Sequence, residues 1–200
     1  MTPHETTRRG IKRIPWGNPR RTSIAGMLVA AALLTSGAAR GEAEIALAVQ
    51  YLPEGDYESA FGVGVYRFES EGFGFYGNVA LTLADRAPYY ESLTVDSFGD
   101  PVTKRYQDLA LFSVGITRAL TENIGGYVGA GYGWAIGVAR KDDPTNILAS
   151  DGEYYVDDPA NDESGLNVNA GLIFFTSGPV FEIGYHSFAE RLYLGVGVLF

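Results

Sequence analysis

Apolar residues recur at every second position through most of the chain after residue 43. This period of two is typical of β-strands, whose successive side chains point to opposite faces. No sustained helical stripe interrupts it. Eight segments of this kind can be drawn: 44–51, 60–68, 72–83, 105–118, 124–140, 165–175, 180–187 and 191–200.

The two faces of these segments differ in size and polarity. In 72–83 one face carries Phe73, Phe75 and Val79, and the other carries mainly Gly, Ala, Asn, Thr and Tyr. A soluble sandwich would place charged residues on its second face, and a soluble lipocalin-like barrel would need large apolar side chains inside. The pattern therefore predicts an all-β fold, an eight-stranded antiparallel up-and-down transmembrane β-barrel with its bulky face towards lipid.

The connections between the segments alternate in length. Three are short turns near residues 70, 121 and 177, whereas 84–104 and 141–164 are long, acidic and rich in Asp, Pro and Tyr. Strands that cross a bilayer with short periplasmic turns and longer outer loops produce this alternation. The connections at 52–59 and 188–190 are brief exceptions on the outer side. We expect 84–104 and 141–164 to be long outer loops.

Aromatic residues on the bulky face gather near the strand ends. Such rings favour the two membrane interfaces, and a soluble core would not place them there. Asp108 falls on the same face, so either it lies near the headgroups or the register shifts there by one residue. The predicted outer girdle is Tyr51, Phe61, Tyr106, Trp134 and Tyr185, and the predicted inner girdle is Phe73, Phe75, Phe174, Phe181 and Phe200.

The amino-terminal segment has the pattern of an export signal. Six Lys and Arg residues precede or flank the uncharged stretch SIAGMLVAAALLTSGAA, and small residues follow it. We expect a cleavable signal peptide at 1–39, with cleavage somewhere in 39–43, and a barrel domain at 40–200. An uncleaved anchor is the alternative, although the apolar stretch is short for a membrane span. Arg20 and Arg21 match only part of a twin-arginine signal.

Charge and cysteine content exclude several classes of function. The chain has a formal net charge of -9, and removal of 1–39 leaves 9 basic and 23 acidic residues, a charge of -14. Proteins that bind nucleic acid need a basic surface, so we expect no nucleic-acid partner. The absence of Cys excludes disulfides, thiol nucleophiles and a lipid-anchored cysteine.

The signal, the eight segments, the alternating connections and the terminal YLGVGVLF together resemble the small outer-membrane β-barrel proteins of Gram-negative bacteria, namely the OmpA-type transmembrane domain and its OmpX-like and OmpW-like relatives. The resemblance covers nearly all of 40–200, as a pattern more than as motifs. It implies location in the cell outer membrane and contact with its lipid and lipopolysaccharide. It also implies that Tyr193, Val198 and Phe200 form the assembly signal read by the barrel-assembly machinery.

A barrel of eight strands leaves a narrow interior, wide enough for side chains or one small ligand. We expect inward tyrosines to fill the space beside the inward glycines, which argues against a broad pore. These tyrosines are Tyr66, Tyr76, Tyr127 and Tyr193. We expect the interior polar groups to be satisfied by neighbours or water; they are Glu182, His186, Asn78, Asn167 and Asn169.

One segment invites comparison with the lipid A deacylase barrels. His186, Ser187 and Glu190 lie close together in GYHSFAERLYL. Adjacent side chains on a strand point to opposite faces, so His186 and Ser187 diverge, and Phe188 stands where those enzymes have serine. We therefore expect no catalytic site and no cofactor, with a lipid A-modifying hydrolase as one alternative and a narrow channel for small solutes as another.

The segment 141–164 gathers carboxylates that are weak candidates for a divalent metal. The candidates are Asp142, Asp143, Asp157 and Asp158. No EF-hand spacing is present, and exposed loops are ordinarily polar, so we expect solvated loop charge and no metal site. The hypothesis is a structural or surface-interaction role in envelope integrity, adhesion or lipopolysaccharide contact through the acidic outer loops. An exported soluble β domain is a further alternative.

Overall fold

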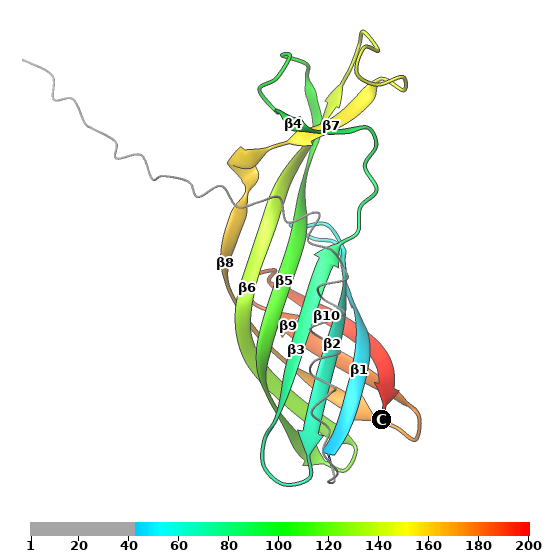
Figure 1. The fold of residues 1–200 in the computed structure, drawn as a ribbon, viewed down its shortest axis with the longest axis vertical. Coiled ribbons are helices and arrows are strands. Elements are labelled where there is room, and N and C mark those ends of the chain that lie inside the picture. Colours follow the sequence, from blue (N-terminus) through cyan, green and yellow to red (C-terminus); the bar gives the residue numbers. More distant parts are fainter. Residues whose placement is uncertain (1–42) are drawn as a thin grey trace, which may run out of the picture. The chain divides into compact units, whose positions relative to one another are not determined.

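A computed structural model describes residues 43–200 of the chain. Eight of its strands form a closed antiparallel ring, in which the last strand pairs with the first (Figure 1). The predicted eight-stranded barrel is confirmed, and the predicted signal peptide lies outside the described residues. The ring, in order, is β1 (Ala43–Leu52), β2 (Ala60–Glu69), β3 (Gly74–Thr82), β5 (Val102–Thr121), β6 (Ile124–Asp142), β8 (Glu163–Phe175), β9 (Pro179–His186) and β10 (Arg191–Leu199).

The ring closes at the carboxyl end of the chain. The backbone N–H of Phe200 donates to the carbonyl oxygen of Ile45 at 2.8 Å. In return, the N–H of Ile45 donates to the carbonyl oxygen of Phe200 at 3.2 Å. Six residue pairs from Ala46↔Leu199 to Tyr51↔Leu194 continue the ladder. The closed ring therefore has no open strand edge, which is how a barrel satisfies its backbone in a membrane.

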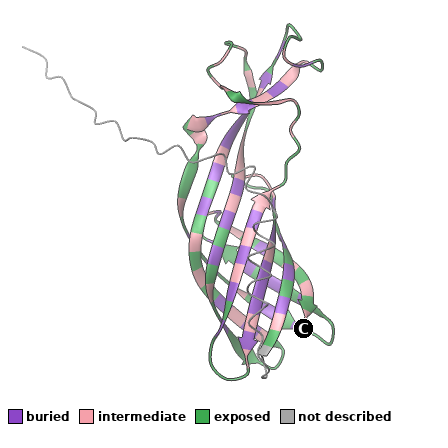
Figure 2. Cartoon of the chain, in the orientation of Figure 1, coloured by how far each residue is buried: buried purple, intermediate pink, exposed green. Residues whose placement is uncertain are grey.

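Buried and exposed residues alternate along the ring strands, as Figure 2 shows by colour. In β9 the alternation is complete, with Val180, Glu182, Gly184 and His186 inside. The girdle residues point outwards, from Phe75 and Phe174 at 38% exposed to Phe200 at 76%, with Tyr106 partly covered. The predicted orientation of the bulky face is confirmed. Within residues 43–200, no helix is both long and apolar enough to cross a bilayer.

Asp108 faces outwards, and the register around it is regular. β5 and β6 pair without a shift from Lys104↔Arg140 to Ala119↔Gly125, so the alternative of a slipped register is wrong. The carboxylate of Asp108 accepts a bond of 2.5 Å from Arg86, whose guanidinium lies over the ring of Tyr106. The acid on the outer face is therefore neutralised at the level of the outer girdle.

The segments 84–104 and 141–164 are not simple loops, which corrects the prediction. They contain β4 (Tyr89–Thr94), β7 (Glu153–Asp157) and the short 3-10 helix η2 (Pro159–Asn161), and β5 and β6 extend further than expected. β7 pairs antiparallel with β6, and β4 pairs parallel with β7. We call residues 84–106 and 137–162 the outer extension. Figure 1 shows β4 and β7 beyond the long-connection end of the ring.

Candidate functional site

The centre of the barrel holds a buried carboxyl group surrounded by hydroxyls. Glu182 accepts hydrogen bonds from the hydroxyls of Tyr66 and Tyr127, the latter at 2.7 Å, and from Nε2 of Gln50 at 3.1 Å. The side chains come from β1, β2, β6 and β9, so the bonds cross the lumen between strands far apart in sequence. Glu182 is 3% exposed. The group acts as a polar bridge that ties opposite walls of the barrel together.

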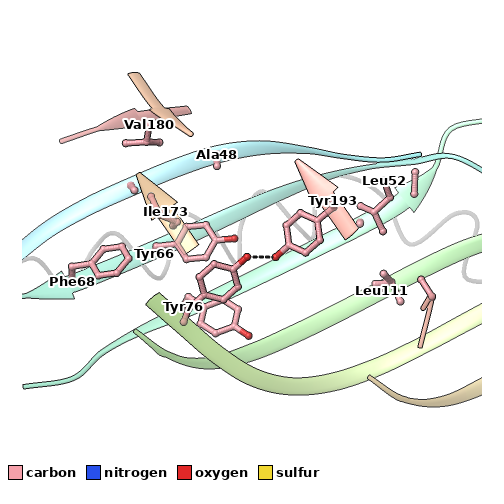
Figure 3. Close-up of a cluster of buried hydrophobic side chains, with 14 of the residues drawn as sticks. Ala48, Leu52, Tyr66, Phe68, Tyr76, Leu111, Ile173, Val180 and Tyr193 are labelled. Atoms are coloured by element: carbon pink, nitrogen blue, oxygen red, sulfur yellow. Dashed lines mark hydrogen bonds between the residues drawn. The ribbon is translucent and has the colours of Figure 1, made fainter. Parts of the chain in front are cut away.

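Tyrosines fill the lumen at this level. The hydroxyls of Tyr127 and Tyr193 lie 2.5 Å apart, and Figure 3 draws this bond as a dashed line at Tyr193. A Cβ on Gly184 would lie 2.2 Å from the Tyr127 hydroxyl, and one on Gly171 would lie 2.1 Å from it, so both sites need glycine. The expectation that inward tyrosines fill the space beside inward glycines is confirmed.

A second group of polar side chains lies next to the one around Glu182. Nδ2 of Asn167 donates to Ser113 Oγ at 2.9 Å and lies 2.8 Å from Nδ1 of His186, whose ring stacks on Tyr193. The hydroxyl of Tyr76 donates to Oδ1 of Asn169 at 2.5 Å. Asn167, Asn169 and His186 thus find neighbours inside the barrel.

Some inward polar atoms have no protein partner. Both amide atoms of the buried Asn78, Nδ2 of Asn169 and Nε2 of His186 make no hydrogen bond to any described residue. Asn78 therefore differs from the other predicted interior polar residues, because neither of its amide atoms reaches a neighbouring side chain. Buried groups of this kind ordinarily bind water.

The three residues considered for catalysis do not converge. His186 points into the lumen, whereas Ser187 is exposed on the other face and its Oγ accepts from the backbone N–H of Val168 at 2.7 Å. Glu190 is exposed in the turn after β9, where its φ is 52°. A triad needs the base to touch both the nucleophile and an orienting acid. This arrangement cannot relay a proton from Ser187 to His186.

The residues of the predicted assembly signal lie on two faces of the last strand. Tyr193 is buried in the lumen, whereas Val198 and Phe200 are exposed on the outer face. The carboxyl-terminal strand therefore contributes both to the interior packing and to the outer apolar surface.

The outer extension has a core of its own, made of Ala139, Ala149, Tyr154 and Val156. Lys141 is fully buried beside it, and its Nζ donates to the carbonyl oxygens of Val95 at 2.9 Å and Ser97 at 2.5 Å. The Tyr154 hydroxyl donates to Asp100 at 2.7 Å. Desolvation and this bond to a carboxylate raise the pKa of Tyr154. Buried side chains of β6 and β7 therefore hold the connection 95–101.

Asp143 organises the turn that follows β6. Its carboxylate accepts bonds from Thr145 Oγ1 at 2.9 Å and from the backbone N–H groups of Leu148 at 2.6 Å and Ala149 at 2.9 Å. Desolvation opposes ionisation, but the bonds from Ala149, Leu148 and Thr145 outweigh it and lower the pKa of Asp143 to about 2. Asp143 is therefore a structural anion that orders 143–149.

The other predicted metal candidates are spread out. Asp158 pairs with Arg105 at 2.8 Å, Asp157 accepts a bond from the Tyr89 hydroxyl, and Asp142 is exposed at the end of β6. Among residues 43–200, no group of three His, Cys, Asp or Glu side chains is placed to hold a metal ion.

Sequence reasoning missed Gln50 and Lys141. Gln50 could have been found, because strand parity places it on the same face as Ala46 and Ala48. Lys141 gave no such signal, since lysine is rarely buried and its acceptors are backbone carbonyls of a distant connection.

No protein-family model matches the sequence, and no curated protein is similar to it. Two similar solved structures are crystal structures of Ail, the attachment invasion locus protein of Yersinia pestis. One of them is in complex with the heparin analogue sucrose octasulfate. Each is 18% identical to this chain, over 79% of this chain and 96% of that one, with TM-scores of 0.44 and 0.43.

Proposed function

We propose that this protein is exported by a signal peptide at 1–39 and resides in the outer membrane of a Gram-negative bacterium, where its outer extension forms an interaction surface. The apolar outward face between two aromatic girdles supports the membrane location, because large exposed apolar surfaces are rare on soluble monomers. The barrel-assembly machinery and lipopolysaccharide are its proposed envelope partners.

The folded outer extension is the observation that carries the proposal. A barrel needs only short links between its strands, yet here β5 and β6 continue beyond the ring and support β7 and β4. A separate core and the buried Lys141 hold this region in one conformation. Ordered surfaces bind with less loss of conformational entropy than mobile loops, so the arrangement favours recognition.

The charge of the extension indicates the chemistry of its partner. The two segments of the extension, 84–106 and 137–162, contain 11 acidic and 5 basic residues. The exposed carboxylates include Asp85, Asp96, Asp142 and Asp151. Such a surface attracts basic proteins, or divalent cations that lipopolysaccharide also binds. We therefore propose that the extension adheres to basic surfaces.

Two other functions receive less support. The buried tyrosines around Glu182 speak against a conducting lumen, and planar-bilayer recordings should detect no steady conductance. The divergent side chains of His186 and Ser187 speak against lipid A hydrolysis. The H186A variant and the unaltered protein should release the same background amount of fatty acid.

The test removes the extension and keeps the ring. Short Gly-Ser linkers replace residues 84–106 and 137–162, which spares the ring pairings that end at Leu81↔Ala110 and Ala135↔Glu163. The variant should still migrate faster on a gel before boiling than after it. Cells that express it should lose binding to wells coated with lysozyme, a basic protein, and wells coated with the acidic protein albumin provide the control.

A second variant separates charge from shape. Asp85, Asp96, Asp142 and Asp151 are exposed and their side chains make no hydrogen bond within residues 43–200, so their replacement by Asn should leave the extension folded. Binding to lysozyme should fall and become less dependent on salt. Unchanged binding by both variants would contradict the proposal. An epitope inserted at 146–147 that antibodies cannot reach on intact cells would also contradict it.

A further inference from the structure

An apolar groove lies on the outward face of the barrel at its short-turn end. Its volume is about 480 Å³, and it is bordered by β5, β6, β8 and the turn before β3. Six apolar residues that shape it are Phe73, Ile116, Leu120, Gly126, Ala170 and Leu172.

The strand register explains why a depression forms here. On the outward face Arg118 lies opposite Gly126, which lies opposite Leu172. One step along the strands, Val128 lies opposite Ala170. Two small residues thus stand diagonally among large ones, and a Cβ on Gly126 would lie only 3.2 Å from a methyl group of Leu120. Gly126 and Ala170 form the floor, and the larger side chains form the walls.

A cation stands at the mouth of the groove. The guanidinium of Arg118 lies 5.2 Å from the centre of the Phe73 ring, which belongs to the inner girdle. Arg118 is exposed and makes no ion pair within residues 43–200. Arg67 also faces outwards at this end, but it pairs with Glu69 at 2.7 Å. Arg118 is therefore the cation here that is open to an external anion.

We propose that this groove binds one acyl chain of an anionic phospholipid, whose phosphate pairs with Arg118. This inference rests on the proposed function, which places the short-turn end of the barrel in the phospholipid leaflet. The chain would lie over Gly126 and Ala170, against Leu120 and Leu172. The headgroup would sit at the depth of Phe73, where the interface between hydrocarbon and water lies.

The chemistry of the groove favours a lipid over other occupants. Its lining is mostly apolar, so a hydrated solute would lose water without gaining hydrogen bonds. The groove also continues the apolar outer face that the girdles bound, where hydrocarbon is the medium. An acidic phosphate completes the site, because guanidinium and phosphate form strong charge-assisted bonds.

The experiment measures binding of a defined lipid to the folded barrel. The protein without residues 1–39 is refolded in detergent micelles, and native mass spectrometry counts bound dioleoylphosphatidylglycerol, with dioleoylphosphatidylcholine as the zwitterionic comparison. One phosphatidylglycerol should be retained in preference. R118A should weaken its retention about tenfold, since a charged hydrogen bond is lost, and A170L should displace it by filling the floor.

Matched variants act as controls. R67A removes a cation of the same face that is already paired, and A130L adds the same volume to an exposed small residue of β6 outside the groove. Both should bind phosphatidylglycerol like the unaltered protein. Equal losses in the controls, no loss in R118A and A170L, or a protein dimer in place of bound lipid would overturn the inference.

The same samples distinguish this inference from the proposed function. A chain that does not become a heat-modifiable barrel in micelles contradicts the membrane proposal itself. A heat-modifiable barrel that binds the two lipids equally contradicts only the groove. R118A leaves the outer extension unchanged, so it should not alter binding of cells to lysozyme.

Discussion

The barrel and the outer extension share the strands β5 and β6 but are stabilised in different ways. Within the ring each strand has two neighbours, so the backbone ladder closes on itself and the interior can be polar, as around Glu182. In the extension the sheet ends at β4, which pairs with β7 alone among residues 43–200. Buried side chains such as Lys141 and Tyr154 hold the extension together, whereas closure of the backbone ladder holds the ring together.

The two kinds of stabilisation predict different consequences of a substitution in each region. A change inside the lumen disturbs groups from several strands at once and should affect the whole barrel. A change in the extension should release a local segment and leave the ring folded.

Replacing Gly184 by valine should have the largest effect, a loss of about 3 kcal/mol in the free energy of unfolding. Even one added carbon would lie 2.2 Å from the Tyr127 hydroxyl and 2.5 Å from the Tyr193 ring. Urea unfolding in micelles measures the loss, and the heat-modifiable band should weaken. In contrast, G178A adds a carbon where nothing lies within 4 Å and should be neutral. A stable G184V barrel would contradict the close packing of Tyr127 and Tyr193 against Gly184.

Replacing Glu182 by alanine should cost about 2 kcal/mol, because buried donors on Tyr66, Tyr127 and Gln50 lose their shared acceptor. The same unfolding measurement applies. E182Q keeps an acceptor oxygen and should lose less. If both variants matched the unaltered protein, the polar bridge would contribute nothing to the barrel.

Replacing Lys141 by methionine should cost about 1.5 kcal/mol locally, because the carbonyl oxygens of Val95 and Ser97 lose a charged donor. Chymotrypsin should then cleave sooner after the phenylalanine within 95–101, while the unfolding of the ring stays the same. K104M changes an exposed lysine whose only described contact is the Tyr106 ring, and it provides the control. A parallel loss of barrel stability would contradict the independence of the two regions.

The smallest effect concerns pH and is confined to the turn after β6. The pKa of Asp143 is lowered from 3.8 to about 2, so its contribution to stability is fully present above about pH 4 and is lost as the pH falls through about 2. The amide protons of Leu148 and Ala149 should titrate with a midpoint near 2 in NMR spectra of the protein in micelles. D143N should abolish this titration, and a midpoint near 3.8 would contradict the described bonds.

The ring was largely predictable from the sequence. Strand parity correctly placed Glu182 and His186 inside and Phe181 outside, because a period of two leaves each residue only one of two faces. The extension was not predictable in the same way. β4 and β7 are only six and five residues long, and the connections that contain them are rich in Asp and Pro, which are depleted in strands.

The candidate site was predictable as a set of residues but not as an arrangement. Parity indicates that Tyr66 and Tyr127 share the lumen, but it does not indicate that both donate to Glu182. Nor does it reveal the groove beside Arg118, which depends on how Gly126 and Ala170 align across β6 and β8.

Alternation is a local property of the chain, so the number of ring strands, the face of each residue and the closing of the ring at Phe200 could be predicted from the residues alone. Which side chains meet across the lumen, and that the long connections fold into an extension, depends on the folded barrel. Those contacts join residues as far apart as Gln50 and Glu182, and their geometry depends on the tilt and register of all eight ring strands together.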